Sequence, residues 1–530
     1  MATVTDFLIE RIRGAGIKHV FGVVGRYNVD LCRAIAAAND INFICTTSEL
    51  HAGFAADAYA RVVGSGCVCI DFNTGLWKLA DAVACAYTER SPLIVIGGAP
   101  GEKEDALDFD AWKSIEEITC SHVVLNQSEV GYMIDYAFEK LNFYKLPVYI
   151  EVPRDLLKKP VTYDVYKQGT PEAPKTKEGP LVELLGEIKC LLEKSQRPVI
   201  IAGVQISRFG LGNELLKFAM KANIPIATTP LSKSVISETH PLSLGVYAGK
   251  GSSEFMRKMV EDSDCVLVLG HAMSDTEGRV PVEFEGAHPE VSVSVNNARV
   301  NHHWYKYIAF SDVIKGLSKL EVSHKKYDST WAKSYEHEDY FPQDNVKITV
   351  KRLFDKINSI LDPQMAIIAD AGDSLFGSIN LVTHRHNHFL SPLYHGSKGF
   401  AIPAALGVQL AKPEVRPIVI VGDGAFQFSC VELGTIAAMG LNPIVVVLNN
   451  HGSAVKKQTG VDFCQTAEWN YEQIVQMIPH SEGVKVETEV ELEEAFTKAC
   501  KSSKLFVINV VVPKDDISPV LRRMIEAHGK

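Results

Sequence analysis

The sequence lacks any long apolar run. No stretch approaches the roughly 18–20 consecutive apolar residues that a membrane-spanning helix needs. The N-terminal segment MATVTDFLIERIRGAG mixes acidic and basic residues and has no apolar signal-peptide core. These absences lead us to expect a cytoplasmic protein with no membrane partner.

The sequence also lacks a basic run and a regular cysteine pattern. The formal net charge is −10 and the calculated pI is about 6.0, which argues against a nucleic-acid partner. The cysteine count is 11, an odd number, and most of these residues stand singly in apolar stretches, which argues against a disulfide framework. Cys67 and Cys69 stand in a strand-like run and should behave as small hydrophobic residues on one face.

The chain does contain many short apolar runs separated by amphipathic segments. Its 530 residues suggest about three domains, since domains commonly have roughly 100–200 residues. Continuous runs rich in Val and Ile are typical of parallel strands covered on both faces. Such runs include HVFGVVG (19–25), CVCIDF (67–72), PVIIAGV (198–204), PIVIVGDG (417–424) and PIVVVLNN (443–450).

Two polar segments divide these runs into three units. Residues 156–183 are rich in proline and polar side chains, and residues 321–344 are polar and aromatic, so both are expected to be linkers. Strands that alternate with helices predict an α/β fold of three doubly wound parallel-sheet domains. We assign these to residues 1–160, 183–322 and 345–530, and the first and third look alike.

One segment carries the clearest chemical signal. In residues 417–450 a buried strand ends in Gly-Asp-Gly, a helix-like stretch (426–439) follows, and a second buried strand ends in Asn-Asn. This arrangement predicts a βαβ unit whose parallel strands end side by side, where open α/β sheets bind ligands. Asp423 and Asn450 offer the oxygen ligands that Mg²⁺ prefers, and Gly424 allows backbone to approach a phosphate. The sequence therefore predicts a Mg²⁺–diphosphate site.

This motif resembles the thiamine-diphosphate motif, and nearly the whole chain resembles the pyruvate and indolepyruvate decarboxylases. The segments that carry the resemblance are SELHAGFAADAYAR (48–61), DAVACAYTERSPLIVIGGAP (81–100), LPVYIEVPRD (146–155), GDSLFGS (372–378), GSKGFAIPAALG (396–407) and the 422–452 unit. The resemblance implies a pyrimidine-binding domain, a middle domain and a diphosphate-binding domain. It also implies the cofactors thiamine diphosphate and Mg²⁺ and a homodimer or homotetramer with sites at the subunit interface.

The resemblance also assigns roles to individual positions. Asp423, Asn450 and the carbonyl group of Gly452 would ligate Mg²⁺. The residues expected at the cofactor are Thr74, Asp373, Ser397, Lys398, Gly424, Ala425 and Gly452. Glu49 matches the catalytic glutamate that hydrogen-bonds the cofactor's aminopyrimidine ring and promotes its reactive tautomer. In the family this glutamate faces the diphosphate domain of another subunit.

The chain departs from these decarboxylases at the groups that move protons. The family's aspartate after the first strand aligns with Arg26, its His-His pair with Trp112 and Lys113, and its glutamate after the second metal ligand with Lys456. Lys398 replaces a bulky apolar residue that bends the cofactor. An ammonium beside a thiazolium cation costs Coulomb energy unless a counter-charge is near.

These replacements leave several functions open. The added cations predict an anion-binding pocket, or else they point to solvent and the proton-transfer groups are simply absent. The leading function is a lyase reaction, the non-oxidative decarboxylation of a small-molecule 2-oxo acid, and the added cations leave open a substrate with a further anionic group. The alternatives are an acetolactate-synthase-like carboligase that joins the decarboxylated fragment to a carbonyl acceptor, and a catalytically impaired cofactor-binding or regulatory homologue. One general acid or base typically contributes about 10²–10⁴-fold to a rate, so decarboxylation with slow aldehyde release is expected.

Other positions carry weaker signals. Trp77 and Lys78 replace small residues of the family pattern and would narrow the substrate side of the pocket, and His451 would lie at its mouth. Residues 203–213 loosely resemble a nucleotide loop without its full glycine pattern. His302 and His303 are adjacent on a predicted strand, so they face opposite ways and suit surface or packing roles better than a metal site.

Overall fold

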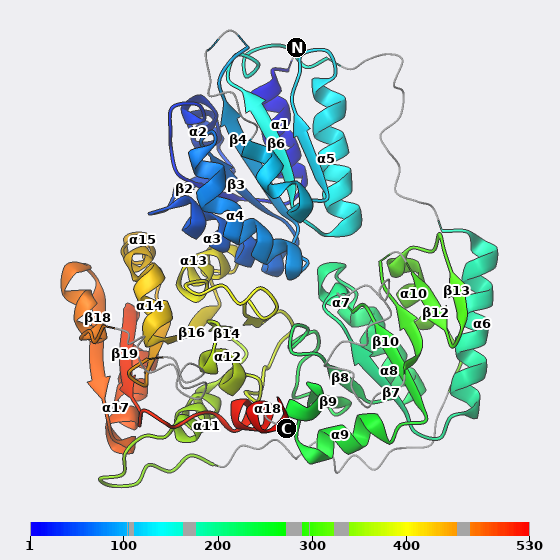
Figure 1. The fold of residues 1–530 in the computed structure, drawn as a ribbon, viewed down its shortest axis with the longest axis vertical. Helices are drawn as coiled ribbons and strands as arrows, with labels where there is room; N and C mark the ends of the chain where they lie inside the picture. The colour runs from blue at the N-terminus through cyan, green and yellow to red at the C-terminus, as the bar shows by residue number, and fades with distance from the viewer. Residues whose placement is uncertain are drawn as a thin grey trace.

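The computed structural model describes residues 2–102, 104, 111–162, 176–271, 289–295, 297–322, 339–452 and 467–528. It contains three sheets of mostly parallel strands flanked by helices, one in each of three domains (Figure 1). The predicted α/β class is therefore confirmed. Within the described residues, none of the helices combines the length and apolar character needed to cross a membrane.

The first domain has a six-stranded, fully parallel sheet in the order β2-β1-β3-β4-β6-β5. Its strands are β1 (His19–Gly22), β2 (Asn42–Cys45), β3 (Gly66–Ile70), β4 (Leu93–Ala99), β5 (Ser121–Val124) and β6 (Val148–Pro153). Its helices are α1 (Val4–Gly14), α2 (Val29–Ala37), α3 (Glu49–Val63), α4 (Thr74–Thr88), the 3₁₀ helix η1 (Ala111–Ile118) and α5 (Val130–Tyr144). Every residue of β3 and β4 is buried, because helices cover both faces of the sheet.

The middle domain has a seven-stranded sheet in the order β13-β12-β11-β10-β7-β8-β9. Its strands are β7 (Pro198–Ala202), β8 (Ile226–Thr228), β9 (Ser243–Val246), β10 (Cys265–Leu269), β11 (Pro289–Val293), β12 (Ala298–Val300) and β13 (His303–Tyr305). Its helices are α6 (Glu178–Lys194), α7 (Gln205–Arg208), α8 (Gly212–Ala222), η2 (Gly249–Gly251), α9 (Glu254–Glu261) and α10 (Phe310–Leu317). Strands β12 and β13 pair antiparallel at one edge of the sheet, which the sequence did not predict.

The third domain has a six-stranded parallel sheet in the order β15-β14-β16-β17-β19-β18. Its strands are β14 (Met365–Ala369), β15 (Phe389–Leu390), β16 (Arg416–Gly422), β17 (Ile444–Asn449), β18 (Ser481–Val486) and β19 (Leu505–Val511). Its helices are α11 (Val350–Ile360), α12 (Asp373–Ser378), α13 (Ala401–Ala411), α14 (Asp423–Ser429), η6 (Cys430–Glu432), α15 (Leu433–Ala438), η7 (Tyr471–Met477), α17 (Glu489–Lys501) and α18 (Pro519–His528).

The first and third sheets share one topology. When the strands of each domain are counted in chain order, both sheets read 2-1-3-4-6-5. In both, the strand order reverses between the parallel first and third strands, which creates a crevice at their carboxyl ends where open α/β sheets bind ligands. The expected likeness of the two domains is confirmed.

The domains pack closely within the chain. Helices α3 and α13 lie against each other where the first domain meets the third (Figure 1). A Cβ atom on Gly407 would lie only 2.0 Å from the carbonyl oxygen of Ala55, so this contact requires glycine. At the other end, α18 returns to the middle domain, where Nε of Arg523 donates to the carbonyl oxygen of Gly251 at 3.0 Å.

Candidate functional site

The 417–450 segment forms the expected βαβ unit. Strands β16 and β17 are parallel neighbours, with Gly422 opposite Leu448, so their carboxyl ends lie side by side. The helix after β16 begins at Asp423 rather than near residue 426, and α14, η6 and α15 continue it without a break to residue 438. The helix therefore begins at the predicted metal ligand itself.

Asp423 connects the two strand ends. Its Oδ2 accepts the backbone N–H of Gly452 at 2.7 Å, and its Oδ1 accepts that of Gly424 at 2.6 Å. The carboxylate is buried. Gly452 has φ of +117° and His451 has φ of +57°, so the backbone after β17 passes twice through the left-handed region, where glycine is favoured.

The two asparagines at the end of β17 have different surroundings. Nδ2 of Asn449 donates to Oδ1 of Asn509 on the neighbouring strand β19, at 3.1 Å. Asn450 is buried beside the turn that ends in Gly452. Carboxylate and amide oxygens at these strand ends, with small Gly424 and Ala425 starting the helix, fit a hard cation and the phosphates it carries.

The turn that carries Lys398 is held by a buried carboxylate. Asp370, which directly follows β14, accepts the backbone N–H groups of Gly399 and Ala401 at 3.1 and 3.0 Å. Burial raises the pKa of Asp370 to about 6, against the lowering effect of these hydrogen bonds and of the nearby Lys398. Lys398 itself is exposed.

Two other predicted cofactor residues already have protein partners. Asp373 accepts hydrogen bonds from the backbone N–H of Ser518, at 2.9 Å, and from its hydroxyl. Burial raises the pKa of Asp373 to about 6. The hydroxyl of Ser397 donates to Oδ2 of Asp81, in α4 of the first domain, at 2.9 Å. Asp373 is therefore held within the third domain, Ser397 joins the third domain to the first, and the role of both residues at the cofactor stays a prediction.

Glu49 begins α3, where the hydroxyl of Ser48 caps the helix by accepting the backbone N–H of His51. The Glu49 side chain is almost fully buried, and its Oε2 lies 3.4 Å from Nζ of Lys78. A Cβ atom on Gly75 would lie 3.7 Å from the Glu49 side chain, so the first turn of α4 packs directly on it. A negative side chain at this position is also favoured by the helix dipole.

The residues around Glu49 bind the third domain of the same chain. Oε2 of Glu432 accepts the backbone N–H of Thr47 at 3.1 Å and lies 2.9 Å from Nδ1 of His51. Burial alone would raise the pKa of Glu432, but hydrogen bonds from His51 and Thr47 outweigh it and lower the pKa. Glu432 follows Asp423 by nine positions, which is about 13 Å along a helix. Glu49 is therefore held near the middle of the helical run that begins at Asp423, about 13 Å along it from that residue.

The loop after β1 is fixed by a carboxylate that the sequence reading did not single out. Asp71, just after β3, accepts the backbone N–H groups of Arg26 and Tyr27 at 3.1 and 2.7 Å. The guanidinium of Arg26 is exposed and stacks 5.3 Å from the Tyr27 ring centre. Thr74 is also exposed, at the start of α4. In the sequence, the only sign of this role of Asp71 is its position directly after a buried strand.

The positions that align with the family's His-His pair form an aromatic stack. Trp112 lies against the ring of His122, with ring centres 4.4 Å apart and nearly parallel planes. Nζ of Lys113 lies 5.7 Å from the Trp112 ring centre, and Lys113 is exposed. Trp77 is exposed on α4. Lys456 lies outside the described residues.

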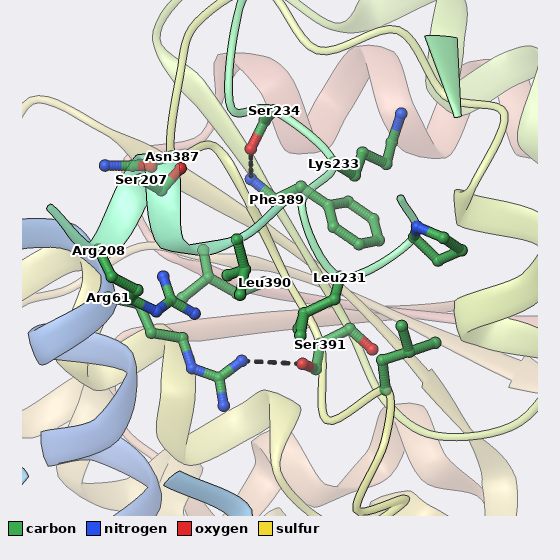
Figure 2. Close-up of a pocket in the computed structure, with 13 residues that line it drawn as sticks. Arg61, Ser207, Arg208, Leu231, Lys233, Ser234, Asn387, Phe389, Leu390 and Ser391 are labelled. Atoms are coloured by element: carbon green, nitrogen blue, oxygen red, sulfur yellow. Dashed lines mark hydrogen bonds between the residues drawn. The ribbon is translucent and has the colours of Figure 1, made fainter. Parts of the chain in front are cut away.

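A small pocket lies where the three domains meet (Figure 2). Figure 2 shows Arg61 of the first domain and Arg208 of the middle domain side by side, with Arg61 donating to the carbonyl oxygen of Ser391 in the third domain at 2.8 Å. The pocket has a volume of about 20 Å³, which accommodates roughly one water molecule, and none of the predicted site residues lines it. Residues of all three domains line this pocket, and it is too small for a substrate.

The weaker sequence candidates lie elsewhere. His303 is exposed on β13, with Nδ1 3.1 Å from Oε1 of Glu187. Its ring, Glu187 and Glu183 place one ligand atom each within 4.8 Å of one another on the surface of the middle domain. Cys67 and Cys69 are buried in β3, in agreement with their expected packing role.

The models of three protein-family domains match the chain in the order of its three folded domains. Residues 2–118 match the model of the thiamine pyrophosphate enzyme N-terminal TPP binding domain, residues 185–320 match its central domain, and residues 370–510 match its C-terminal TPP binding domain. The chain belongs to the thiamine pyrophosphate enzymes. Thiamine pyrophosphate is the same compound as thiamine diphosphate, so the expected family and organic cofactor are confirmed at this level.

Curated decarboxylases are similar to the chain over nearly its full length. A probable pyruvate decarboxylase of Schizosaccharomyces pombe is 25% identical over 98% of this chain and 94% of its own length. An alpha-keto-acid decarboxylase of Mycobacterium avium is 27% identical over 99% and 96%. Pyruvate decarboxylase 4 of Arabidopsis thaliana is 28% identical over 98% and 90%. Identity at this level over nearly the full length supports a shared scaffold and leaves individual pocket residues free to differ.

Proposed function

We propose that the chain is a thiamine-diphosphate- and Mg²⁺-dependent lyase that decarboxylates a 2-oxo acid without oxidation. The observation that carries the proposal is the convergence of Asp423, Asn450 and Gly452 at the ends of β16 and β17. The names of the full-length relatives, pyruvate and alpha-keto-acid decarboxylases, support the substrate class.

The residues of the chain divide the work. Asp423, Asn450 and the Gly452 carbonyl group would hold Mg²⁺, and Gly424 and Ala425 would approach the diphosphate. The bound cofactor supplies a thiazolium ring that takes up the electron pair left when CO₂ departs. Glu49 would hydrogen-bond the aminopyrimidine ring, and its burial beside Gly75 leaves that side chain little contact with water.

The separation of the two half-sites supports a homodimer or homotetramer. Within one chain Glu49 is held near Glu432, nine positions along the helical run from Asp423. Trp77, on α4 beside Glu49, is 56% exposed, and Phe428, on α14, is 64% exposed. Exposed large apolar side chains beside both half-sites are typical of surfaces that another subunit covers. A second copy would bring one chain's Glu49 to the other chain's Asp423.

The pocket chemistry supports carboligation as a second candidate. Arg26 and Lys113 stand where the family's decarboxylases have an aspartate and a histidine, and both are exposed cations. Such cations suit an anionic substrate or acceptor, and they differ from the carboxylate and imidazole that the resemblance assigns to aldehyde release. The fragment that remains after loss of CO₂ would then be released by joining a carbonyl acceptor.

A single-turnover assay of the full chain with thiamine diphosphate and Mg²⁺ separates these functions. CO₂ release from pyruvate or another 2-oxo acid, lost in Glu49→Gln, would support the lyase. Release of CO₂ without free aldehyde, with turnover restored by an added carbonyl acceptor, would favour the carboligase. Absence of cofactor binding would overturn both and leave a regulatory or structural role.

A further inference from the structure

Lys78 is the charged partner of Glu49. Nζ of Lys78 lies 3.4 Å from Oε2 of Glu49, and within the described part of the chain no other side chain forms an ion pair with this carboxylate. The two residues come from different helices, since Glu49 begins α3 and Lys78 lies one turn into α4. The ion pair is therefore a tertiary contact at the carboxylate on which the proposed function depends.

The two side chains differ in exposure. The Glu49 side chain is 9% exposed, whereas that of Lys78 is 58% exposed. Gly75, from the same turn of α4, packs against Cγ and Oε1 of Glu49. The carboxylate is thus fixed in place, while the lysine has an exposed flexible stem and can leave without disturbing the core.

We infer that Lys78 competes with the cofactor for the carboxylate of Glu49. This inference rests on the proposed function. In the cofactor-free chain the ammonium group holds Oε2 of Glu49. When this carboxyl group hydrogen-bonds to the aminopyrimidine ring, the ion pair with Lys78 weakens. The free energy of the lost ion pair is then subtracted from the free energy of cofactor binding.

The sign of the effect follows from this competition. Replacing Lys78 with a neutral side chain removes the competitor and strengthens cofactor binding. A partly exposed ion pair is worth up to about 1 kcal/mol, so the expected gain in affinity is about two- to fivefold. The gain should shrink as salt is added, because salt screens an exposed charge.

The test is a calorimetric titration of the cofactor-free full chain with thiamine diphosphate at fixed Mg²⁺. We expect Lys78→Met to lower the dissociation constant about two- to fivefold and Lys78→Arg, which keeps the charge, to stay near the wild-type value. Lys258→Met is the matched control, because Lys258 pairs with Glu254 at 2.6 Å on exposed α9 of the middle domain. It should leave the dissociation constant unchanged.

A double-mutant cycle shows whether Lys78 acts through Glu49. In a Glu49→Gln background, Lys78→Met should no longer strengthen binding, because the ion pair is already absent. Equal affinity of wild type and Lys78→Met, weaker binding by Lys78→Met, or an undiminished gain in the Glu49→Gln background would each overturn the inference while leaving the proposed function intact. Failure of the wild-type chain and every variant to bind the cofactor would overturn the proposed function and this inference with it.

Discussion

The carboxylate of Asp423 accepts the backbone N–H of Gly452 at 2.7 Å, which joins the ends of β16 and β17 through one side chain. The bond places Asp423 in contact with the turn that carries a second predicted metal ligand. Because Gly452 has φ of +117°, the position of this turn depends on a residue without a side chain.

The first prediction concerns this link. Asp423→Ala removes a proposed ligand and the bond to Gly452, so the affinity for thiamine diphosphate with Mg²⁺ should fall at least about tenfold, since Mg²⁺ uses few protein ligands. Gly452→Ala should weaken binding in the same direction by straining the turn. Titration calorimetry measures both, and Asp344→Ala, at an exposed aspartate, is the control. Unchanged affinity in Asp423→Ala would refute the proposed metal site.

The second prediction concerns the contact between α3 and α13. Gly407→Ala places a Cβ atom 2.0 Å from the backbone oxygen of Ala55, which cannot move without shifting α3. Overpacking of this kind costs about 1–3 kcal/mol of unfolding free energy or more. Denaturant unfolding followed by circular dichroism should show the loss in the first transition. Gly186 lies on the exposed face of α6, and a Cβ atom there would have no neighbour within 4 Å. Gly186→Ala should therefore raise the unfolding free energy by about 0.5–1 kcal/mol.

The third prediction concerns the buried ion pair of Arg61 and Asp57. Nη2 of Arg61 lies 2.6 Å from Oδ2 of Asp57, and both side chains are almost fully buried. Arg61→Met leaves Asp57 charged and unpaired, which typically costs about 3–5 kcal/mol. Arg33→Met, which breaks an exposed pair with Asp30, should change the unfolding free energy by less than about 1 kcal/mol. Similar midpoints for both variants in urea would contradict the prediction.

The elements that carry the site could be predicted from sequence because their signals are local. The apolar run before Asp423 and the run before Asn449 became β16 and β17, and the helix-like stretch at 426–439 lies largely in α14, η6 and α15. Continuous Val and Ile runs identify buried strands without any knowledge of what covers them. The edge strand β18, with sequence SEGVKV, carries no such run and was not predicted.

The side-chain contacts between distant segments, within and between domains, could not be predicted in this way. The pairing of Lys78 with Glu49, of Ser397 with Asp81 and of Thr47 with Glu432 joins residues whose approach depends on how whole helices pack. The sequence marked Lys78 only as larger and more basic than expected at its position. Its partner became visible only once α3 and α4 were placed side by side.

The last prediction concerns pH and Glu89, which lies beside Arg61 where the domains meet. Burial raises the pKa of Glu89 to about 7 from an ordinary value of 4.5, although Arg61 and the backbone N–H of Tyr394 act to lower it. In the unfolded chain this carboxyl ionises at lower pH than in the folded chain. Its contribution to stability is therefore fully present below about pH 4.5 and is lost as pH rises to about 7.

Glu89→Gln keeps an acceptor for the Tyr394 N–H, at 2.7 Å in the wild type, but cannot ionise. The unfolding free energy of the wild type should thus fall relative to that of Glu89→Gln between pH 5 and pH 7.5, by on the order of 1–3 kcal/mol. Urea unfolding of both proteins across this range measures the difference, and taking the difference cancels the other titrating groups. Parallel curves, or a wild type that gains on the variant as pH rises, would show that Glu89 is ionised throughout in the folded protein.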